Sequence, residues 1–224
     1  MEYILAVIII VICYVIGSIP FGLLVVRIAS GKDVRKVGSG RTGGTNVMRA
    51  AGWFAGVITA MLDILKGLSS VWICGLILPG NELVKVFAAA AAVLGSIHSI
   101  FLAERDDNGK LRLRGGAGGA TSLGGAMALW GQIWMIILPV GVAVYLLVGF
   151  ASMTTISIAL SSLVIFAFRT WVWGEPWQYI LYGAIDLLLV AYALIPNLKR
   201  MAAGNERTVG LRAYLKKRRG EKTE

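Results

Sequence analysis

The sequence is poor in the residues on which many enzymes depend. Its 224 residues include one histidine and two cysteines, and we find no Ser-His-Asp set, no HxxxxD acyltransferase pattern and no His or Cys metal cluster. His98 stands near the end of an apolar segment, where packing is its more common role. Cys13 and Cys74 fall inside apolar segments without CxxC spacing, which predicts that they pack among apolar neighbours. We therefore expect neither a metal nor another cofactor.

Charged residues are also scarce. They make up 15% of the chain, whereas hydrophobic residues make up 57% and the mean hydropathy is +0.75. A soluble core of this size does not hide so much apolar surface, so the composition predicts an integral membrane protein. The start of the chain lacks the basic residues of a signal peptide and has Glu2 in their place, so we interpret it as a retained first span.

Long apolar segments recur along the whole chain. They predict an all-α polytopic protein with about seven transmembrane helices, five or six being the alternative. The segment at 119–131 is too short to cross about 30 Å of hydrocarbon alone, so we expect a half-span there or a merger with its neighbour. No linker or repeat divides the chain, which predicts one membrane domain over 1–210 and a basic, solvated tail over 211–224. The seven segments are 3–30, 53–79, 83–103, 119–131, 132–149, 150–171 and 176–196.

The positive charges are clustered. Of the 22 lysines and arginines, 19 lie around three polar segments, namely the loop after the first span, the loop at 104–118 and the chain from Lys199 onward. The positive-inside rule predicts that these segments face the cytoplasm, with the N-terminus outside and the C-terminus cytoplasmic. Trp171, Trp173 and Trp177 would then form an aromatic belt at the outer interface. The net charge of +10 is thus assigned to orientation and to anionic membrane lipid, not to nucleic acid.

The first polar segment reads GSGRTGGTNVMR at 38–49 and combines glycines with hydroxyl, amide and guanidinium groups. Glycines let backbone N–H groups approach a ligand closely, and guanidinium groups bind phosphate oxygens. A connector that carries only orienting charge has no need of this density of glycine and hydroxyl. The segment predicts a cradle for a phosphorylated ligand at the membrane surface, and the candidate binding residues are Ser39, Arg41, Thr45, Asn46 and Arg49.

A second glycine-rich segment, RGGAGGATS at 114–122, stands directly before an apolar segment. A glycine-rich turn at a helix N-terminus presents unpaired N–H donors and the positive end of the helix dipole. The segment lacks the GK[ST] of a P-loop and follows no strand of a βαβ unit, so a nucleotide fold is not indicated. Close helix packing is the alternative role of the glycines. The candidate phosphate-binding residues are Arg114, Gly115, Gly116 and Gly118.

Asp63, Lys66 and Asp186 fall well inside predicted spans, where charge is costly unless it is paired or solvated. Asp63 and Lys66 are three residues apart and therefore share one helix face. They form either a structural ion pair or a wall of the site, which makes Lys66 a candidate substrate-binding residue. Asp186, in the last apolar segment, is an alternative partner for Lys66.

A third polar segment, NLKRMAAGNE at 197–206, follows the last span on the same side as the two loops. If the three segments meet between the helices, they form a cationic pocket at the depth of lipid headgroups, open sideways to acyl chains. Asn197 and Glu206 are its candidate site residues.

Taken in order, these motifs resemble the bacterial acyl-phosphate:glycerol-3-phosphate acyltransferase family of the PlsY type, over nearly the whole chain. The resemblance implies transfer of a fatty acyl group from acyl phosphate to the sn-1 hydroxyl of glycerol 3-phosphate, giving lysophosphatidic acid and phosphate in phospholipid biosynthesis. It implies a multi-pass enzyme of the bacterial inner membrane, with a cytoplasmic active site that needs no acyl carrier protein, coenzyme A or metal. The matching motifs are GSIPFG at 17–22, DVRKVGSGRTGGTNVMRAAG at 33–52, DILKG at 63–67, RGGAGGATSLGG at 114–125 and NLKRMAAGNE at 197–206.

The resemblance also assigns roles to residues. Ser39, Arg49, Asn197 and Glu206 match positions that contact the glycerol phosphate, and we expect them to be catalytic. The glycine-rich segment is implied to receive the phosphoryl group of the acyl phosphate, here through the backbone of Gly115, Gly116 and Gly118.

The chain departs from the family pattern at four positions, which makes it a divergent member. Arg41 stands where asparagine is usual, Ala117 replaces a lysine, and Ser96 and Leu194 replace histidines. The loss at Ala117 is the largest, because a lysine there would neutralise phosphate directly.

Compensation by other cations is our main hypothesis for this loss. Arg41 and Arg114 are the candidates, since guanidinium binds phosphate oxygens bidentately. The alternatives are a lipid-binding paralogue with altered catalysis and, less favoured, a small anion transporter. The inserted sequence at 104–114 is expected to form a hairpin that turns at Asn108 and Gly109.

Overall fold

The computed structural model describes residues 1–105 and 108–219, and these residues are mainly helical. Six stretches are long and apolar enough to cross a membrane: Glu2–Ser30, Trp53–Ile77, Glu82–Leu102, Gly131–Val148, Ala151–Trp173 and Gln178–Ala202. The helices are α1 (Glu2–Ser18), α2 (Phe21–Ser30), α3 (Gly44–Ala51), α4 (Trp53–Ile77), α5 (Glu82–Ile97), α6 (Gly119–Leu129), α7 (Trp134–Ala143), α8 (Ala151–Trp173), α9 (Gln178–Ala202) and α10 (Gly210–Arg218).

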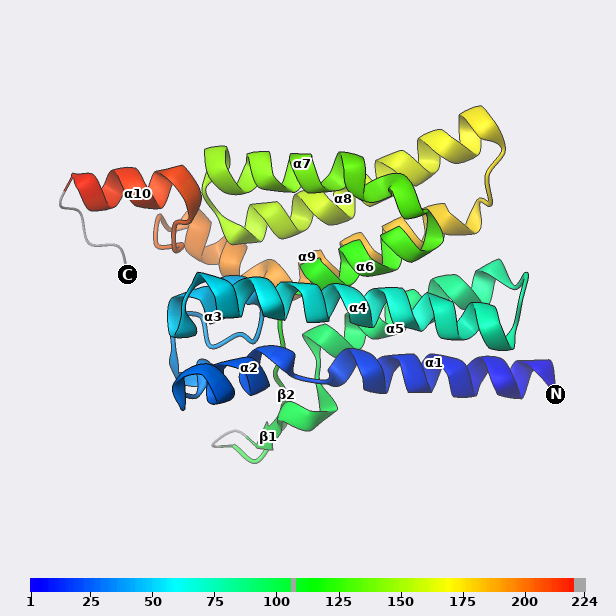
Figure 1. Cartoon of the computed structure of the whole chain (residues 1–224), viewed down its shortest axis with the longest axis horizontal. Coiled ribbons are helices and arrows are strands. Elements are labelled where there is room, and N and C mark those ends of the chain that lie inside the picture. Colours follow the sequence, from blue (N-terminus) through cyan, green and yellow to red (C-terminus); the bar gives the residue numbers. More distant parts are fainter. Residues whose placement is uncertain (106–107, 220–224) are drawn as a thin grey trace.

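The short helix predicted at 119–131 is α6, which has 11 residues. Figure 1 shows that it begins near the middle of the long axis, because the loop before it runs back alongside the end of α5. Six long spans and one short helix thus confirm the all-α, polytopic class predicted from the sequence. The first span is broken after Ile19, where Pro20 removes a backbone donor and α2 restarts the helix.

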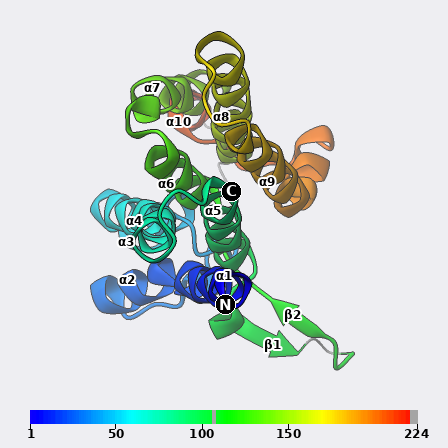
Figure 2. The ribbon, with the colours of Figure 1, turned by 90° about the vertical axis from the view of Figure 1, so that its right-hand side faces the viewer.

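Glycines set the closest helix contacts. Figure 2 looks along the bundle and shows α1, α4 and α5 on one side, α7, α8 and α9 on the other, and α6 between them. A Cβ atom on Gly67 of α4 would overlap the backbone of Thr121, Gly124 and Gly125 at the start of α6. The two backbones therefore touch directly, as in small-residue interfaces between membrane helices. This contact holds the first turn of α6 against α4.

Replacement of Gly67 by valine is expected to separate α4 from α6, because the overlapping atoms belong to backbone and have no rotamer to change. The expected loss of unfolding free energy is more than about 3 kcal/mol, or roughly 6–12 °C in Tm for a chain of this length. Thermal unfolding in detergent measures it. Gly75→Val on the same helix is the matched control, since the nearest atom to its Cβ position is Lys85 Cε at 3.9 Å. Equal Tm values for the two variants would contradict the contact.

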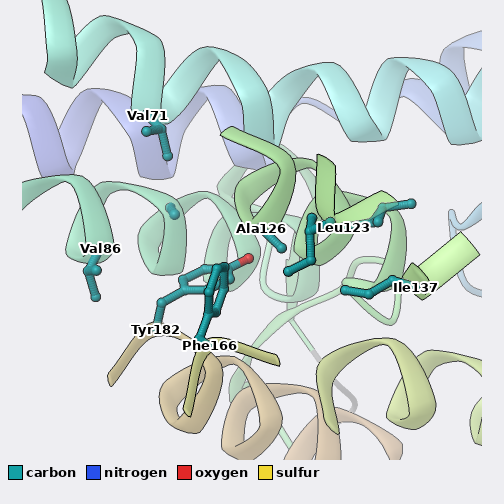
Figure 3. Packing of buried hydrophobic residues seen from close by; sticks show 9 residues of the cluster. Val71, Val86, Leu123, Ala126, Ile137, Phe166 and Tyr182 are labelled. Carbon is teal, nitrogen blue, oxygen red and sulfur yellow. The ribbon is translucent and has the colours of Figure 1, made fainter. Parts of the chain in front are cut away.

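The largest buried apolar cluster lies between α4, α5, α6, α8 and α9. Figure 3 shows Tyr182 and Phe166 packed toward Leu123 and Ala126 of α6. The Tyr182 hydroxyl donates a hydrogen bond to the Ser122 carbonyl at 2.7 Å, so the one polar atom of this ring is satisfied. Cys13 and Cys74 share a second buried cluster, which confirms that they pack among apolar neighbours.

The N-terminus and α10 lie at opposite ends of the long axis (Figure 1). Trp171, Trp173 and Trp177 are exposed at the end that carries the N-terminus, and the loops rich in basic residues gather toward the other end. This arrangement agrees with the predicted belt and with an even number of crossings between the basic segments. Which end is cytoplasmic stays a prediction of the positive-inside rule.

The insertion and the tail are both folded where they are described. Strands β1 (Ala103–Arg105) and β2 (Leu111–Leu113) pair in antiparallel register, which confirms the predicted hairpin. The basic tail predicted over 211–224 is helical up to Arg218, because α10 forms there and packs on the π-helical turn η4 (Val144–Val148). The remaining predicted tail, 220–224, lies outside the described residues.

Candidate active site

One buried amide organises the first polar loop. The side chain of Asn46, on α3, is 3% exposed. Its Oδ1 accepts a hydrogen bond from the Ser39 N–H at 3.1 Å, and its Nδ2 donates to the carbonyls of Val34, Val37 and Arg41 at 3.2, 2.9 and 2.9 Å. All of its hydrogen-bonding capacity is therefore used by the loop. The predicted binding residue Asn46 shapes the cradle and has no donor left for a ligand.

The second loop lies beside the first. The Thr42 N–H donates to the Gly115 carbonyl at 3.4 Å, and the Gly116 N–H donates to the Ser96 carbonyl at 2.8 Å. Gly118 has φ of +82°, a left-handed conformation that favours glycine, and it is the N-cap of α6. Within the described chain, the N–H groups of Ala117, Gly118 and Gly119 donate no hydrogen bond to the protein. The free donors at 117–119 therefore include the predicted Gly118, whereas the N–H group of the predicted Gly116 is used by the protein.

The end of α9 supplies the third polar element. The Asn197 Nδ2 donates to Glu206 Oε1 at 2.7 Å, and the Arg200 Nε donates to Glu206 Oε2 at 3.0 Å. Glu206 is thus held between an amide and a guanidinium, and its side chain is 5% exposed. The Asn197 Oδ1 is buried and, among the described residues, has no donor. Such an acceptor is suited to a ligand hydroxyl.

These three elements enclose one cavity of about 300 Å³. Its wall brings together residues that the sequence placed on three distant segments, together with apolar residues of α4, α6, α7 and α8 such as Ile64, Leu123, Leu138 and Ile158. The predicted site residues that line it are Ser39, Arg41, Thr45, Arg49, Gly116, Gly118, Asn197 and Glu206.

Besides Asn46, three predicted residues lie outside this wall. Arg114 pairs with Glu104 of the hairpin and borders an adjacent groove, which shares Ser39, Arg41 and Gly116 with the cavity. Gly115 packs against the end of α5, where a Cβ atom would overlap the carbonyls of Ser96 and Ile97. Lys66 points to Asp63, with Nζ and Oδ1 2.8 Å apart. Each of these residues is engaged by the protein itself.

Two of the three buried ionisable residues singled out in the spans pair with each other, and the third, Asp186, has one oxygen without a partner among the described residues. Lys66 and Asp63 have side chains 4% and 10% exposed, and the Lys66 Nζ lies 5.1 Å from the centre of the Phe21 ring. Asp186 accepts a hydrogen bond from Ser122, so the alternative pairing of Asp186 with Lys66 was wrong. Asp63 borders the cavity but Lys66 does not, and the ion pair braces α4 behind the site.

The sequence did not point to several polar residues of the wall, among them Tyr145, Thr121, Ser152 and Arg207. The Thr121 and Ser152 hydroxyls are buried and have no hydrogen-bond partner among the described residues. Both stand in the first turn of a helix, α6 and α8, which was the only available signal. Tyr145 and Arg207 reach the wall only because the chain after α9 returns to η4, a tertiary contact that no local pattern predicts.

Arg41 lies deepest among the cations of the wall. Its Nη1 donates to the Gly116 carbonyl at 3.4 Å and its Nη2 to the Ala193 carbonyl at 2.5 Å. Burial lowers the pKa of Arg41, the charge of Arg200 lowers it further, and Glu206 opposes this. An anionic ligand stabilises a guanidinium in this position, because the anion replaces the stabilisation that water gives to an exposed charge.

Comparison of the chain with known proteins identifies its family. A family model described as glycerol-3-phosphate acyltransferase matches residues 7–204. The chain belongs to the glycerol-3-phosphate acyltransferase family. This confirms the family indicated by the motifs.

Several members of the acyltransferase family are similar over nearly their whole length. Glycerol-3-phosphate acyltransferase 3 of Dehalococcoides mccartyi is 35% identical over 223 residues, covering 92% of this chain and 96% of the relative. The glycerol-3-phosphate acyltransferase of Rubrobacter xylanophilus is 37% identical over 212 residues, covering 93% and 98%.

Two crystal structures of PlsY, an integral membrane glycerol 3-phosphate acyltransferase, share the fold. The glycerol 3-phosphate form has a TM-score of 0.78 at 29% identity and covers 94% of this chain and 98% of PlsY. The lysophosphatidic acid form has a TM-score of 0.76 at 29% identity. This acyltransferase is therefore a multi-pass membrane protein, as the composition predicted.

Proposed function

We propose that this acyltransferase moves a fatty acyl group from acyl phosphate to the sn-1 hydroxyl of glycerol 3-phosphate, on the cytoplasmic side of a bacterial plasma membrane. The observation that carries the proposal is the single cavity that joins Ser39, Arg49 and Asn197 to the glycine-rich loop. Relatives named glycerol-3-phosphate acyltransferase, and PlsY forms with glycerol 3-phosphate and lysophosphatidic acid, support the acceptor and the product. The proposal adds acyl phosphate as the donor.

The donor phosphate is assigned to the start of α6. The free N–H groups at 117–119 and the positive end of the α6 dipole support an anion there. Arg41 lines the same part of the cavity and Arg114 does not, which supports Arg41 alone as the replacement for the lysine missing at Ala117. Glu104 already neutralises Arg114, so we do not assign Arg114 to the donor phosphate.

The acyl chain is assigned to the apolar part of the wall. Ile64, Leu123, Leu138 and Ile158 line the cavity beyond the polar residues, and the helices that carry them are spans or lie between spans. A chain placed there stays in an apolar environment while its carboxyl carbon faces Ser39 and Asn197. A water-soluble protein carrier is not needed to deliver such a donor, so we expect no acyl carrier protein.

The reaction needs alignment more than a strong protein base. The acceptor hydroxyl oxygen attacks the acyl carbonyl carbon, a new ester C–O bond forms, and the C–O bond to the phosphoryl group breaks, releasing phosphate. The hydroxyl proton passes to the acceptor's own phosphate, whose second pKa is about 6 by analogy with phosphoserine. Ser39 and the free Oδ1 of Asn197 orient the hydroxyl, Arg49 holds the acceptor phosphate, and the N–H groups at 117–119 hold the leaving phosphate.

The purified protein is expected to release phosphate from palmitoyl phosphate only when glycerol 3-phosphate is present, with lysophosphatidic acid formed in equal amount. Phosphate release and product analysis by mass spectrometry measure both. Binding of both substrates without turnover would instead identify a lipid-binding paralogue. Uptake of phosphate into vesicles without chemistry would identify an anion transporter. Among the described residues no His, Cys, Asp or Glu side chains group as metal ligands, so the assay is run without added metal.

A further inference from the structure

Two guanidinium groups at one end of the cavity are unpaired. Arg49 and Arg207 both line the cavity, and neither donates a hydrogen bond or forms an ion pair with any described residue. They are close enough for the charge of Arg207 to act on Arg49. Partial burial lowers the pKa of Arg49 and the Arg207 charge lowers it further, while Tyr145 and Glu206 oppose this. Two neighbouring, uncompensated cations repel each other unless an anion binds between them.

Glu206 acts on Arg49 through its charge but forms no hydrogen bond or ion pair with Arg49 or Arg207. Both oxygens of Glu206 are already bonded, one to Asn197 and the other to Arg200. A positive end that the protein leaves unneutralised is complementary to a dianion, and a phosphate monoester offers two charges and three acceptor oxygens. The free donors of the α6 loop belong to another segment of the same wall, which leaves them for the second phosphorylated substrate of the proposed reaction.

The residues of this end are held by the chain that follows α9. We call residues 205–210 the C-terminal strap. Its Val209 N–H donates to the Gly149 carbonyl at 2.9 Å, and Thr208 pairs with Phe150 in an isolated antiparallel bridge. Beyond it, the Arg212 guanidinium stacks 4.6 Å from the centre of the Phe150 ring. The strap thereby fixes Arg207 beside the turn between α7 and α8.

The same strap braces Tyr145. This residue stands on the π-helical turn η4, and a Cβ atom on Gly210, which has φ of +57°, would meet its backbone carbonyl. A π-helical turn inside a span is uncommon and occurs frequently at functional sites, since the extra residue redirects a side chain. Here it presents a phenol hydroxyl, a hydrogen-bond donor, to the cavity beside Arg49.

We propose that Arg207 and Tyr145 bind the phosphate group of glycerol 3-phosphate together with Arg49. The acceptor phosphate lies between the two guanidinium groups and accepts a hydrogen bond from the Tyr145 hydroxyl. This assignment rests on the proposed function and adds to it a second cation for the acceptor, delivered by the strap. It separates the acceptor end, with Arg49 and Arg207, from the donor end, with Arg41 and the α6 loop.

The test compares Arg207→Ala with Arg218→Ala, which removes the same charge from the exposed face of α10 outside the cavity. Arg207→Ala is expected to raise the KM for glycerol 3-phosphate about tenfold to a hundredfold, the value of a lost charge-assisted hydrogen bond. The KM for palmitoyl phosphate is expected to stay within about twofold of the parent value. Arg207→Lys is expected to recover part of the loss, and Tyr145→Phe to show a smaller rise. Arg218→Ala is expected to leave both constants unchanged.

Binding of propyl phosphate, a phosphate monoester without an acceptor hydroxyl, tests the site without chemistry. Calorimetric titration is expected to give a Kd weakened by the same factor in Arg207→Ala, whether or not the protein turns over. An unchanged Kd and an unchanged KM for glycerol 3-phosphate would overturn the proposal, as would a rise confined to the KM for palmitoyl phosphate. Failure of the parent protein to turn over, with a weakened Kd in the variant, would refute the proposed function and keep the phosphate site. If Arg207→Ala does not fold, the same KM and Kd measurements are made on Arg207→Gln, with the same expected and contradicting results.

Discussion

Replacement of Arg41 by alanine is expected to lower kcat/KM for acyl phosphate by about a hundredfold to a thousandfold, the range for loss of one preorganised oxyanion donor. The reason is the absence of another cation at the donor end. Ala117 provides no charge, Arg114 is neutralised by Glu104, and Lys66 is neutralised by Asp63. Phosphate release at varied palmitoyl phosphate and saturating glycerol 3-phosphate measures the effect.

Two further variants make this prediction specific. Arg114→Ala is the matched control and is expected to keep kcat/KM within about threefold of the parent value. The double variant Arg41→Asn with Ala117→Lys restores the residues usual in the family and is expected to recover most of the activity lost in Arg41→Ala. Full turnover in both single alanine variants would show that neither arginine replaces the missing lysine. A double variant as weak as Arg41→Ala would mean that the Arg41 side chain acts through its bond to the Ala193 carbonyl.

Glycerol 3-sulfate is expected to bind but not to react. It has nearly the shape of glycerol 3-phosphate, yet its sulfate group does not accept a proton at neutral pH, so the proposed internal base is lost. The expected fall in turnover is about a hundredfold to ten-thousandfold, the usual contribution of general acid–base catalysis. Product analysis by mass spectrometry measures it, and competitive inhibition of the normal reaction verifies that the analogue occupies the site.

The pH dependence of kcat/KM is an independent test of the acceptor phosphate as the base. A phosphate monoester loses its second proton near pH 6, and only the dianion accepts the hydroxyl proton. We therefore expect kcat/KM to fall as the pH drops below about 6 and to level off above about 7. A normal rate with glycerol 3-sulfate would exclude the acceptor phosphate as the base. A value of kcat/KM that does not change between about pH 5 and 7 would exclude it as well.

The spans were predictable because their physical cause is local. Some 20 apolar residues in sequence have one stable state in hydrocarbon, and the boundaries followed from glycine, proline and charge. The short helix α6 was recognised for the same reason, since its length alone separates it from a full span. The hairpin also followed from a local signal, the turn at Asn108 and Gly109 with alternating residues after it.

The site was predictable only as far as composition indicates chemistry. Glycine, hydroxyl and guanidinium groups on three segments predicted an anion pocket, and the structure brings Ser39, Arg49 and Asn197 to one cavity. The sequence did not predict which of these polar residues are free to bind a ligand. Asn46 forms hydrogen bonds within its own loop and Lys66 pairs with Asp63. Such pairings depend on neighbours in space, which the sequence does not show.

The C-terminal strap explains why Arg207 and Tyr145 were missed. Arg207 and Tyr145 are far apart in the sequence, and the bridge between Phe150 and Thr208 brings their segments together. A two-residue contact of this kind leaves no periodicity and no composition that a reader of the sequence recognises. Only the fold shows that the unpaired cation beside Arg49 comes from beyond the last span.

The position of the strap has a consequence for truncation. Glu206 and Arg207 follow α9, so a chain cut at the end of α9 keeps its candidate spans, its glycine-rich loop and its first cradle. Such a chain lacks the carboxylate that pairs with Asn197 and Arg200. On the proposal above, it also lacks the second cation for the acceptor phosphate.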